Sequence, residues 1–337
     1  MDFLATIFDW LLSFFRTSTA FERQFYVFKF LHADEFTPDA RMGSSLQFFS
    51  TKTSDRDRQW LMDRAAASGE NALCFFVFNY GHADGREGRV SIMNDPENIE
   101  SGISAERVKN VAAWCRKMRR KGLFPVPIGV CCETEPMPRR WAAWVCANAD
   151  SVAEAIVPTL NEFEPLWCSL LEVEKCFSPA DKSAPLRLYR AIAARQTNPL
   201  GVGIHGTSAP SFADCADWLG FEQGGDPSAW NNVKPRDFWG QIQRYLRDAR
   251  GKLVLVMEYS LGRYGSFCEL QGLAGAFQET DRLIGVGCGA PRGLADFMRQ
   301  IPRGMIAGRT DDVAILSWAD GSQARHANLF TGNFWSV

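Results

Sequence analysis

Short uninterrupted apolar runs recur along this chain and are separated by polar stretches with helical periodicity. The run at 253–258, with the sequence LVLVME, is representative, because five apolar residues are followed directly by the carboxylate of Glu258. Apolar runs of this length indicate strands that are buried on both faces, as in parallel sheets covered by helices. The pattern therefore predicts a parallel sheet wrapped by helices.

Eight runs of this kind predict strands at 25–32, 72–80, 123–132, 167–175, 200–206, 217–223, 253–260 and 282–289. Helical segments are predicted at 55–68, 104–122, 138–163, 185–196, 235–251, 266–279 and 292–301. Eight strands that alternate with helical segments favour a closed barrel, so the predicted fold class is α/β, a (β/α)8 TIM barrel. The alternative is an open doubly wound sheet, but neither GxGxxG nor GxxxxGKS/T follows a strand.

Capping residues define the ends of one predicted helix, and prolines argue against one of the predicted strands. Ser104 is a predicted N-cap, and Gly122 is the predicted stop of the same helix. Pro125 and Pro127 argue against an ordinary central strand at 123–132, because proline has no N–H for a sheet hydrogen bond. The third strand is therefore the least regular of the eight.

The N-terminal residues 2–15 are strongly apolar and predict an amphipathic helix. Its large apolar side chains recur at helical spacing and are Phe3, Ile7, Trp10, Leu11 and Phe14. A segment of about 14 residues is too short to span a bilayer, and it lacks the basic n-region of a signal peptide. The helix either packs on the body of the protein or docks it onto a membrane surface or a protein partner.

The predicted domains are an N-terminal helix at 1–20, the barrel at 21–303 and a C-terminal extension at 304–337. Within the extension, 313–320 and 324–330 are predicted to form a β-hairpin packed on the barrel. Two long loops, 80–102 and 223–235, follow the second and sixth strands. Both lie on the predicted catalytic side of the barrel, where loops normally shape a binding cleft.

Composition narrows the functional class. The 337 residues carry a formal net charge of −2, which argues against a dedicated nucleic-acid binder. Ten cysteines occur without a CxxC pair, so buried free thiols in a reducing, cytoplasmic compartment are expected rather than disulfides or zinc. HxH spacing is missing as well, and no metal or other cofactor is predicted.

Carboxylates stand at the ends of the predicted fourth and seventh strands. Glu172 and Glu174 end the fourth, and Glu258 ends the seventh. Carboxyl ends of parallel barrel strands share one rim, where the chemistry of such folds takes place. Paired carboxylates there suit glycoside hydrolysis, in which one donates a proton and the other is the nucleophile. Glu172, two residues before Glu174, is expected to face the same side one layer deeper and is an alternative functional residue.

A (β/α)8 barrel with a Glu ending strand four and another ending strand seven resembles the clan A glycoside hydrolases. The resemblance covers residues 24–302 in architecture and rests on two residues. It implies that Glu174 is the acid/base and Glu258 the nucleophile of a retaining enzyme. The family commonly has Asn before the strand-four Glu, whereas Val173 stands here.

The same resemblance implies further substrate contacts. His205 and Glu222, at the ends of the fifth and sixth strands, fall where substrate-positioning residues commonly lie. Packing inside the protein is the alternative role for His205. Trp230 and Tyr259 are the predicted surfaces on which a sugar ring would stack.

Two functional hypotheses follow from these observations. The first is a glycoside hydrolase-like barrel that cleaves or binds a carbohydrate by a two-carboxylate mechanism. The alternative is a catalytically inactive glycosidase-like barrel that serves as a binding or structural module of a membrane-associated, virion or secretion assembly. The distance between the two carboxyl groups discriminates between them.

Overall fold

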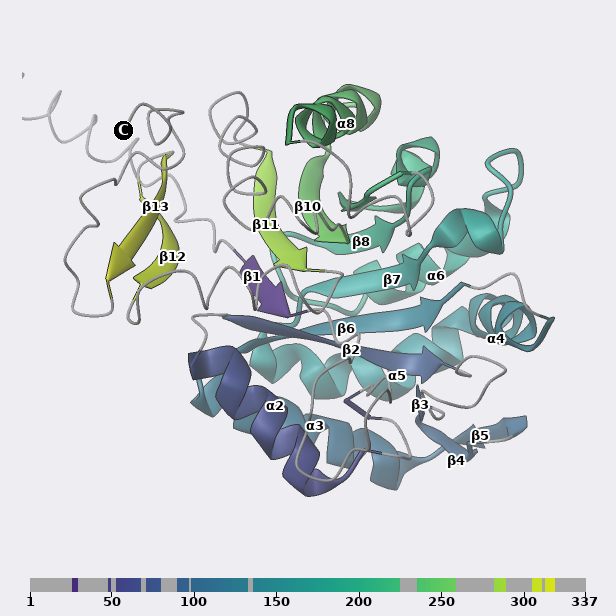
Figure 1. Ribbon diagram of the computed structural model, residues 1–337. Coiled ribbons are helices and arrows are strands. Elements are labelled where there is room, and N and C mark those ends of the chain that lie inside the picture. Colours follow the sequence, from purple (N-terminus) through teal and green to yellow (C-terminus); the bar gives the residue numbers. More distant parts are fainter. Residues whose placement is uncertain are drawn as a thin grey trace, which may run out of the picture.

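The fold is described from a computed structural model (Figure 1). The structure describes residues 26–29, 48–49, 53–67, 71–79, 90–96, 98–132, 136–224, 235–258, 282–288, 305–310 and 313–318. The predicted N-terminal helix and the helices predicted at 266–279 and 292–301 lie outside these residues.

The described residues include eight parallel strands that form a closed ring. In ring order they are β1 (Tyr26–Lys29), β2 (Ala72–Asn79), β6 (Phe124–Cys131), β7 (Trp167–Leu171), β8 (Val202–His205), β9 (Trp218–Glu222), β10 (Leu253–Glu258) and β11 (Leu283–Cys288). Strand β1 pairs in parallel with β11 on one side and with β2 on the other, and this second pairing closes the ring. The predicted α/β class and (β/α)8 TIM barrel are therefore confirmed.

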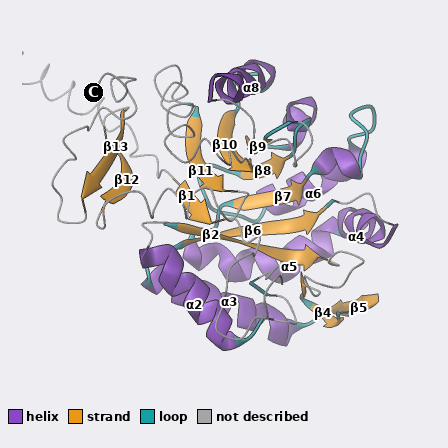
Figure 2. Cartoon of the chain, viewed as in Figure 1, coloured by secondary structure: helices purple, strands orange, loops and turns teal. Residues whose placement is uncertain are grey.

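Helices cover the outside of the strands in the part of the chain that is described (Figure 2). They are α2 (Asp55–Ala67), α3 (Ala105–Arg120), α4 (Pro136–Ala147), α5 (Ala149–Leu160), α6 (Ser183–Ala193) and α8 (Pro235–Asp248). The predicted boundaries of α3 are confirmed. The side chain of Ser104 accepts a hydrogen bond from the Arg107 N–H, and Gly122 ends the helix region with a φ of +76°. None of the described helices is long and apolar enough to cross a membrane.

The core has two parts, one on each face of the strands. In β2, Ala72, Cys74 and Phe76 belong to a cluster made of strand and strand-flanking residues, which fills the barrel interior. The intervening residues of β2 pack instead in a second cluster together with the helices. Both faces of the strands are therefore buried, which is why the strands read as unbroken apolar runs. Trp218 fills part of the interior beside Gly203, where a Cβ would overlap the indole ring.

Strand β6 contains two prolines, and both lie before the stretch of the strand that is paired with neighbouring strands on both sides. The register with β2 begins at Phe124, but the register with β7 begins only at Ile128. Pro125 and Pro127 therefore precede the stretch in which β6 is paired on both sides. The Pro125 carbonyl still accepts a hydrogen bond from the Leu166 N–H at 3.0 Å.

Two predicted segments differ from the structure. The predicted loop at 80–102 contains short strands, which are β3 (Val90–Ser91), β4 (Met93–Asp95) and β5 (Asn98–Ile103). The C-terminal hairpin pairs β12 (Met305–Thr310) with β13 (Val313–Trp318), so 313–320 follows its partner rather than preceding it. Thr310 and Val313 are partners in the antiparallel register of these two strands. The partner predicted at 324–330 lies outside the described residues.

Candidate active site

The end of β7 sets the positions of the two predicted carboxylates that follow it. The strand was predicted to continue to residue 175, but it ends at Leu171. Glu172 adopts a left-handed conformation, with φ 52° and ψ 47°, and Val173–Lys175 form a 3-10 turn. The predicted strand alternation, with Glu172 directly beneath Glu174, is therefore wrong, because side chains in a 3-10 turn do not alternate between two faces.

Glu172 is buried and ion-paired. Its residue exposure is 9%, and Oε1 lies 2.5 Å from the Nζ of Lys175. The Sγ of Cys131 lies 3.9 Å from the other carboxylate oxygen, and the Glu172 N–H donates to the Nδ1 of His205 at 3.4 Å. Lys175 thus neutralises Glu172, and this pair ties the end of β7 to the turn that follows it.

Glu174 is held by the segment that follows β8. Its Oε1 accepts two hydrogen bonds from Thr207, one from the backbone N–H at 2.8 Å and one from the hydroxyl at 2.7 Å. Its Oε2 is buried and has no hydrogen-bond partner among the described residues. The carboxylate lies against Gly206, where a Cβ would overlap it. Gly206 has a φ of +148°, so glycine is required both for backbone conformation and for space.

His205, the last residue of β8, is completely buried. A Cβ at Gly220 would contact both the imidazole and the Sδ of Met257, so this glycine makes room for two side chains. The backbone N–H of Gly206 donates to the carbonyl of Gly220 at 3.2 Å and joins the ends of β8 and β9. The imidazole is therefore packed beneath the rim of the barrel.

Glu222 and Glu258 end two adjacent strands, β9 and β10, and their Cα atoms are partners in the register. The register shifts between Val256 and Glu258, which marks a bulge at the end of β10. The side chain of Glu258 lies outside what the structure describes, as do Trp230 and Tyr259 entirely. The backbone nevertheless brings these two glutamate positions to the same end of the sheet.

Tyr245 of α8 is a site residue that the sequence analysis missed. Its hydroxyl lies 2.6 Å from the Gly220 carbonyl, to which it donates, and 3.3 Å from that of Gly206. Burial raises the pKa of this phenol well above its ordinary value, and the nearby charges of Glu174 and Glu222 raise it further. The two carboxylates therefore lie within electrostatic range of one buried hydroxyl. In the sequence, the only indication that Tyr245 is buried was its position on the apolar face of the helix at 235–248.

The cysteines behave as buried packing residues. The side chains of eight of them are described, all as free thiols, and among these only Cys176 is not buried. Burial raises the pKa of the Cys115 and Cys168 thiols far above the ordinary range. Within the described residues, no group of three or more His, Cys, Asp or Glu side chains is arranged to hold a metal ion.

No protein-family model matches the sequence, and no curated protein matches it either. Solved structures do match in fold. A glycoside hydrolase family 5 enzyme from Prevotella bryantii B14 is 10% identical, with 84% of this chain and 93% of that chain covered and a TM-score of 0.51. A mutant of that enzyme, in complex with a xyloglucan tetradecasaccharide, matches with 9% identity, 80% and 90% coverage and a TM-score of 0.50.

An endo-1,4-β-mannanase from Rhizomucor miehei matches with 12% identity, coverage of 75% of this chain and 89% of that chain, and a TM-score of 0.48. At such identities the likeness concerns the fold. The two matches with TM-scores of 0.50 and 0.51 show that the chain is similar in fold to a (β/α)8-barrel glycoside hydrolase.

Proposed function

We propose that this barrel acts on a carbohydrate by a two-carboxylate mechanism, with Glu174 as acid/base and Glu258 as nucleophile. The observation that carries the proposal is the fixed position of Glu174. Thr207 holds its carboxylate at the end of the barrel where β10 finishes in Glu258. Groups held on strand ends meet the geometric demands of catalysis better than groups on long loops.

In this mechanism the Glu174 carboxyl donates its proton to the glycosidic oxygen while the Glu258 carboxylate attacks the anomeric carbon. The glycosidic bond breaks, and the sugar stays bound to Glu258 as an ester. Glu174, now deprotonated, then removes a proton from water, which attacks the anomeric carbon and releases the sugar. A separation of about 5–5.5 Å between the two carboxyl groups is required for this retaining reaction.

The remaining predicted residues have supporting roles in the proposal. Glu222 is proposed to contact the sugar, and the pairing of its Cα with that of Glu258 supports this role. Glu172 and His205 are buried and are proposed as further substrate-binding residues. Trp230 and Tyr259 are proposed as stacking surfaces for sugar rings, since aromatic faces are apolar and rigid.

One observation favours the alternative function, a binding or structural module without activity. Glu174 already bonds Thr207 through one oxygen, and its other oxygen is buried against Gly206. A carboxylate in this arrangement serves to join β7 to β8. Under this alternative, the helix proposed at residues 2–15 would dock the barrel onto a membrane surface or a protein partner.

We further propose a reducing compartment such as the cytoplasm for this protein. The free thiols at buried positions support this assignment, because an oxidising compartment favours disulfides. The proposed domain boundaries remain 1–20 for the N-terminal helix, 21–303 for the barrel and 304–337 for the C-terminal extension.

A panel of aryl glycosides and polysaccharides tests the two functions. Glu258→Gln should abolish the glycosyl-enzyme ester, which intact-protein mass spectrometry detects. Glu174→Ala should slow substrates with poor leaving groups by roughly 10²- to 10⁴-fold and spare those with good ones, since only the former need a proton donor. Glu154→Gln, an exposed change on α5, is the matched control. Saturable sugar binding without turnover would instead support the binding module.

A further inference from the structure

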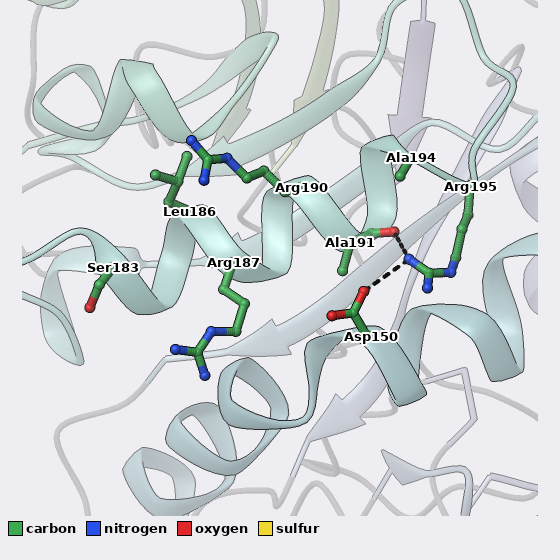
Figure 3. A pocket seen from close by; sticks show the side chains of 8 residues that line it. All are labelled: Asp150, Ser183, Leu186, Arg187, Arg190, Ala191, Ala194 and Arg195. Carbon is green, nitrogen blue, oxygen red and sulfur yellow. Dashed lines mark hydrogen bonds and ion pairs between the residues drawn. The ribbon is translucent and has the colours of Figure 1, made fainter.

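A pocket of about 420 Å³ lies on the outer surface of the barrel, between α5 and α6 (Figure 3). Its lining residues are Asp150, Ser183, Leu186, Arg187, Arg190, Ala191, Ala194 and Arg195. None of them belongs to the candidate active site. The pocket is thus separate from the candidate active site, and three of its eight lining residues are arginines.

The charges of this pocket are not balanced by its own residues. Arg195 is paired with Asp150 at 3.2 Å and also donates to the Ala191 carbonyl at 2.9 Å. Arg187 and Arg190 are exposed and make no ion pair within the described part of the chain. The pocket therefore carries two uncompensated positive charges, although the whole chain has a formal net charge of −2.

The two arginines do not stabilise α6. It contains no acidic residue, and Arg187 and Arg190 are three positions apart on the same face. Like charges on neighbouring turns of one helix face destabilise a helix slightly. The two guanidinium groups point away from each other, as expected of like charges (Figure 3). Their Cβ atoms are roughly 5–6 Å apart at this helical spacing, so contact of both guanidinium groups with a common anion requires a change of rotamer.

We propose that this pocket binds the phosphoryl group of a small organic phosphate through Arg187 and Arg190. Guanidinium groups form bidentate, charge-assisted hydrogen bonds with phosphate oxygens. The small side chains of Ala191 and Ala194 leave room for the organic part, and Leu186 gives it an apolar contact. A pocket of this size matches a small molecule, because ligand pockets usually measure about 300–1,000 Å³.

Titration calorimetry at low ionic strength with inorganic pyrophosphate tests the proposal. Saturable one-to-one binding is expected for the wild-type chain. The double variant Arg187→Gln, Arg190→Gln should weaken it at least tenfold. The matched control removes two positive charges from α3, as Lys109→Gln and Arg120→Gln, and should change the affinity less than twofold. Both pairs are exposed, so circular dichroism should show unchanged folding in each variant.

Replacement of Arg187 and Arg190 by lysine tests whether the planar guanidinium group contributes to binding beyond its positive charge. It keeps the net charge but removes the planar fork, so an affinity between those of the wild type and the glutamine variant is expected. Competition by a hexose phosphate and by a nucleoside diphosphate then distinguishes the sources of the phosphoryl group.

Three results would overturn the proposal. The first is no saturable binding of pyrophosphate to the wild-type chain. The second is an equal loss of affinity in the pocket variant and in the α3 control, which would mean attraction by general surface charge. The third is tighter binding of an acidic peptide, such as oligoglutamate, than of any phosphate, which would make the pocket a protein-docking surface.

Discussion

Thr207 binds the Glu174 carboxylate twice, through its backbone N–H and through its hydroxyl, with both bonds to Oε1. The two residues are 33 positions apart and follow different strands, β7 and β8. The contact therefore fixes the Glu174 side chain to the neighbouring strand end rather than to its own turn. It also joins two strand ends of the barrel at the rim.

Removal of the Thr207 hydroxyl should destabilise the rim. Thr207→Val keeps the shape of the side chain and deletes one hydrogen bond to a carboxylate. We expect the free energy of unfolding to fall by about 1 kcal/mol. This loss is modest because Thr207 is exposed. Thr207→Ser keeps the hydroxyl and should lose less than half of that. Urea denaturation monitored by tryptophan fluorescence measures both. An equal loss in both variants would assign the effect to the methyl group instead.

Gly206 should be intolerant of a side chain. Gly206→Ala places a methyl group in a backbone conformation that favours glycine and against the Glu174 carboxylate. We expect a loss of roughly 2–4 kcal/mol, as strain and overpacking add. Gly122→Ala is the matched control, because Gly122 also has a positive φ but a Cβ there meets no atom within 4 Å. It should cost about 1 kcal/mol.

A double-mutant cycle isolates the contact between Gly206 and Glu174. If the methyl group collides with the carboxylate, Glu174→Ala should recover about 1–2 kcal/mol in the Gly206→Ala background. The same Glu174→Ala change should recover nothing in the Gly122→Ala background. Strictly additive losses at Gly206 and Glu174 would mean that backbone strain alone makes the glycine necessary.

Strand positions were largely predictable from sequence, because a strand that is buried on both faces is an uninterrupted run of apolar residues. The runs at 72–80 and 253–260 were predicted almost as the structure has β2 and β10. The end of β7 was not, since a left-handed glutamate such as Glu172 is unusual and carries no sequence signal. The turn therefore began three residues before the apolar pattern predicted it.

The hydrogen-bond partners at the rim could not be predicted from sequence. Thr207 and Tyr245 reach the candidate site through tertiary contacts between residues at least 25 positions apart. A threonine after a strand and a tyrosine on the apolar face of a helix are ordinary in any globular protein. The tertiary structure brings Thr207 to the Glu174 carboxylate and the Tyr245 hydroxyl to the carbonyls of Gly206 and Gly220.

Thiol reactivity should follow burial. Among the eight cysteines whose side chains are described, Cys176 should react first with a thiol reagent under native conditions, because it alone is not buried. Burial raises the pKa of Cys146 to about 12, so its reactive thiolate is scarce at neutral pH. Peptide mapping of the labelled protein identifies each site, and Cys176→Ser should remove the fast-labelled peptide. Rapid native labelling of Cys115 or Cys168 would contradict this order.

Alkaline pH should destabilise the protein partly through Tyr245. Burial first, and then the charges of Glu174 and Glu222, raise the folded-state pKa of this phenol well above 10. The unfolded chain therefore releases the phenolic proton near pH 10 while the folded protein keeps it. The stability that this group contributes is complete below pH 10 and is lost as the pH rises toward the folded-state pKa. The expected slope for one proton is about 1.4 kcal/mol per pH unit.

Tyr245→Phe removes this titration. Below pH 9 the variant should be less stable by about 1–2 kcal/mol, because the hydrogen bond to the buried Gly220 carbonyl is lost. Above pH 10 the difference from the wild type should shrink as the wild type loses stability. Tyr189→Phe is the comparison, since burial and its bond to Asp217 raise the pKa of Tyr189 to about 12, so its contribution is complete below pH 10 and is lost between pH 10 and pH 12. Urea denaturation from pH 8 to pH 12 measures all three proteins. A constant difference between wild type and Tyr245→Phe across that range would show that this phenol ionises in the folded protein as it does in the unfolded chain.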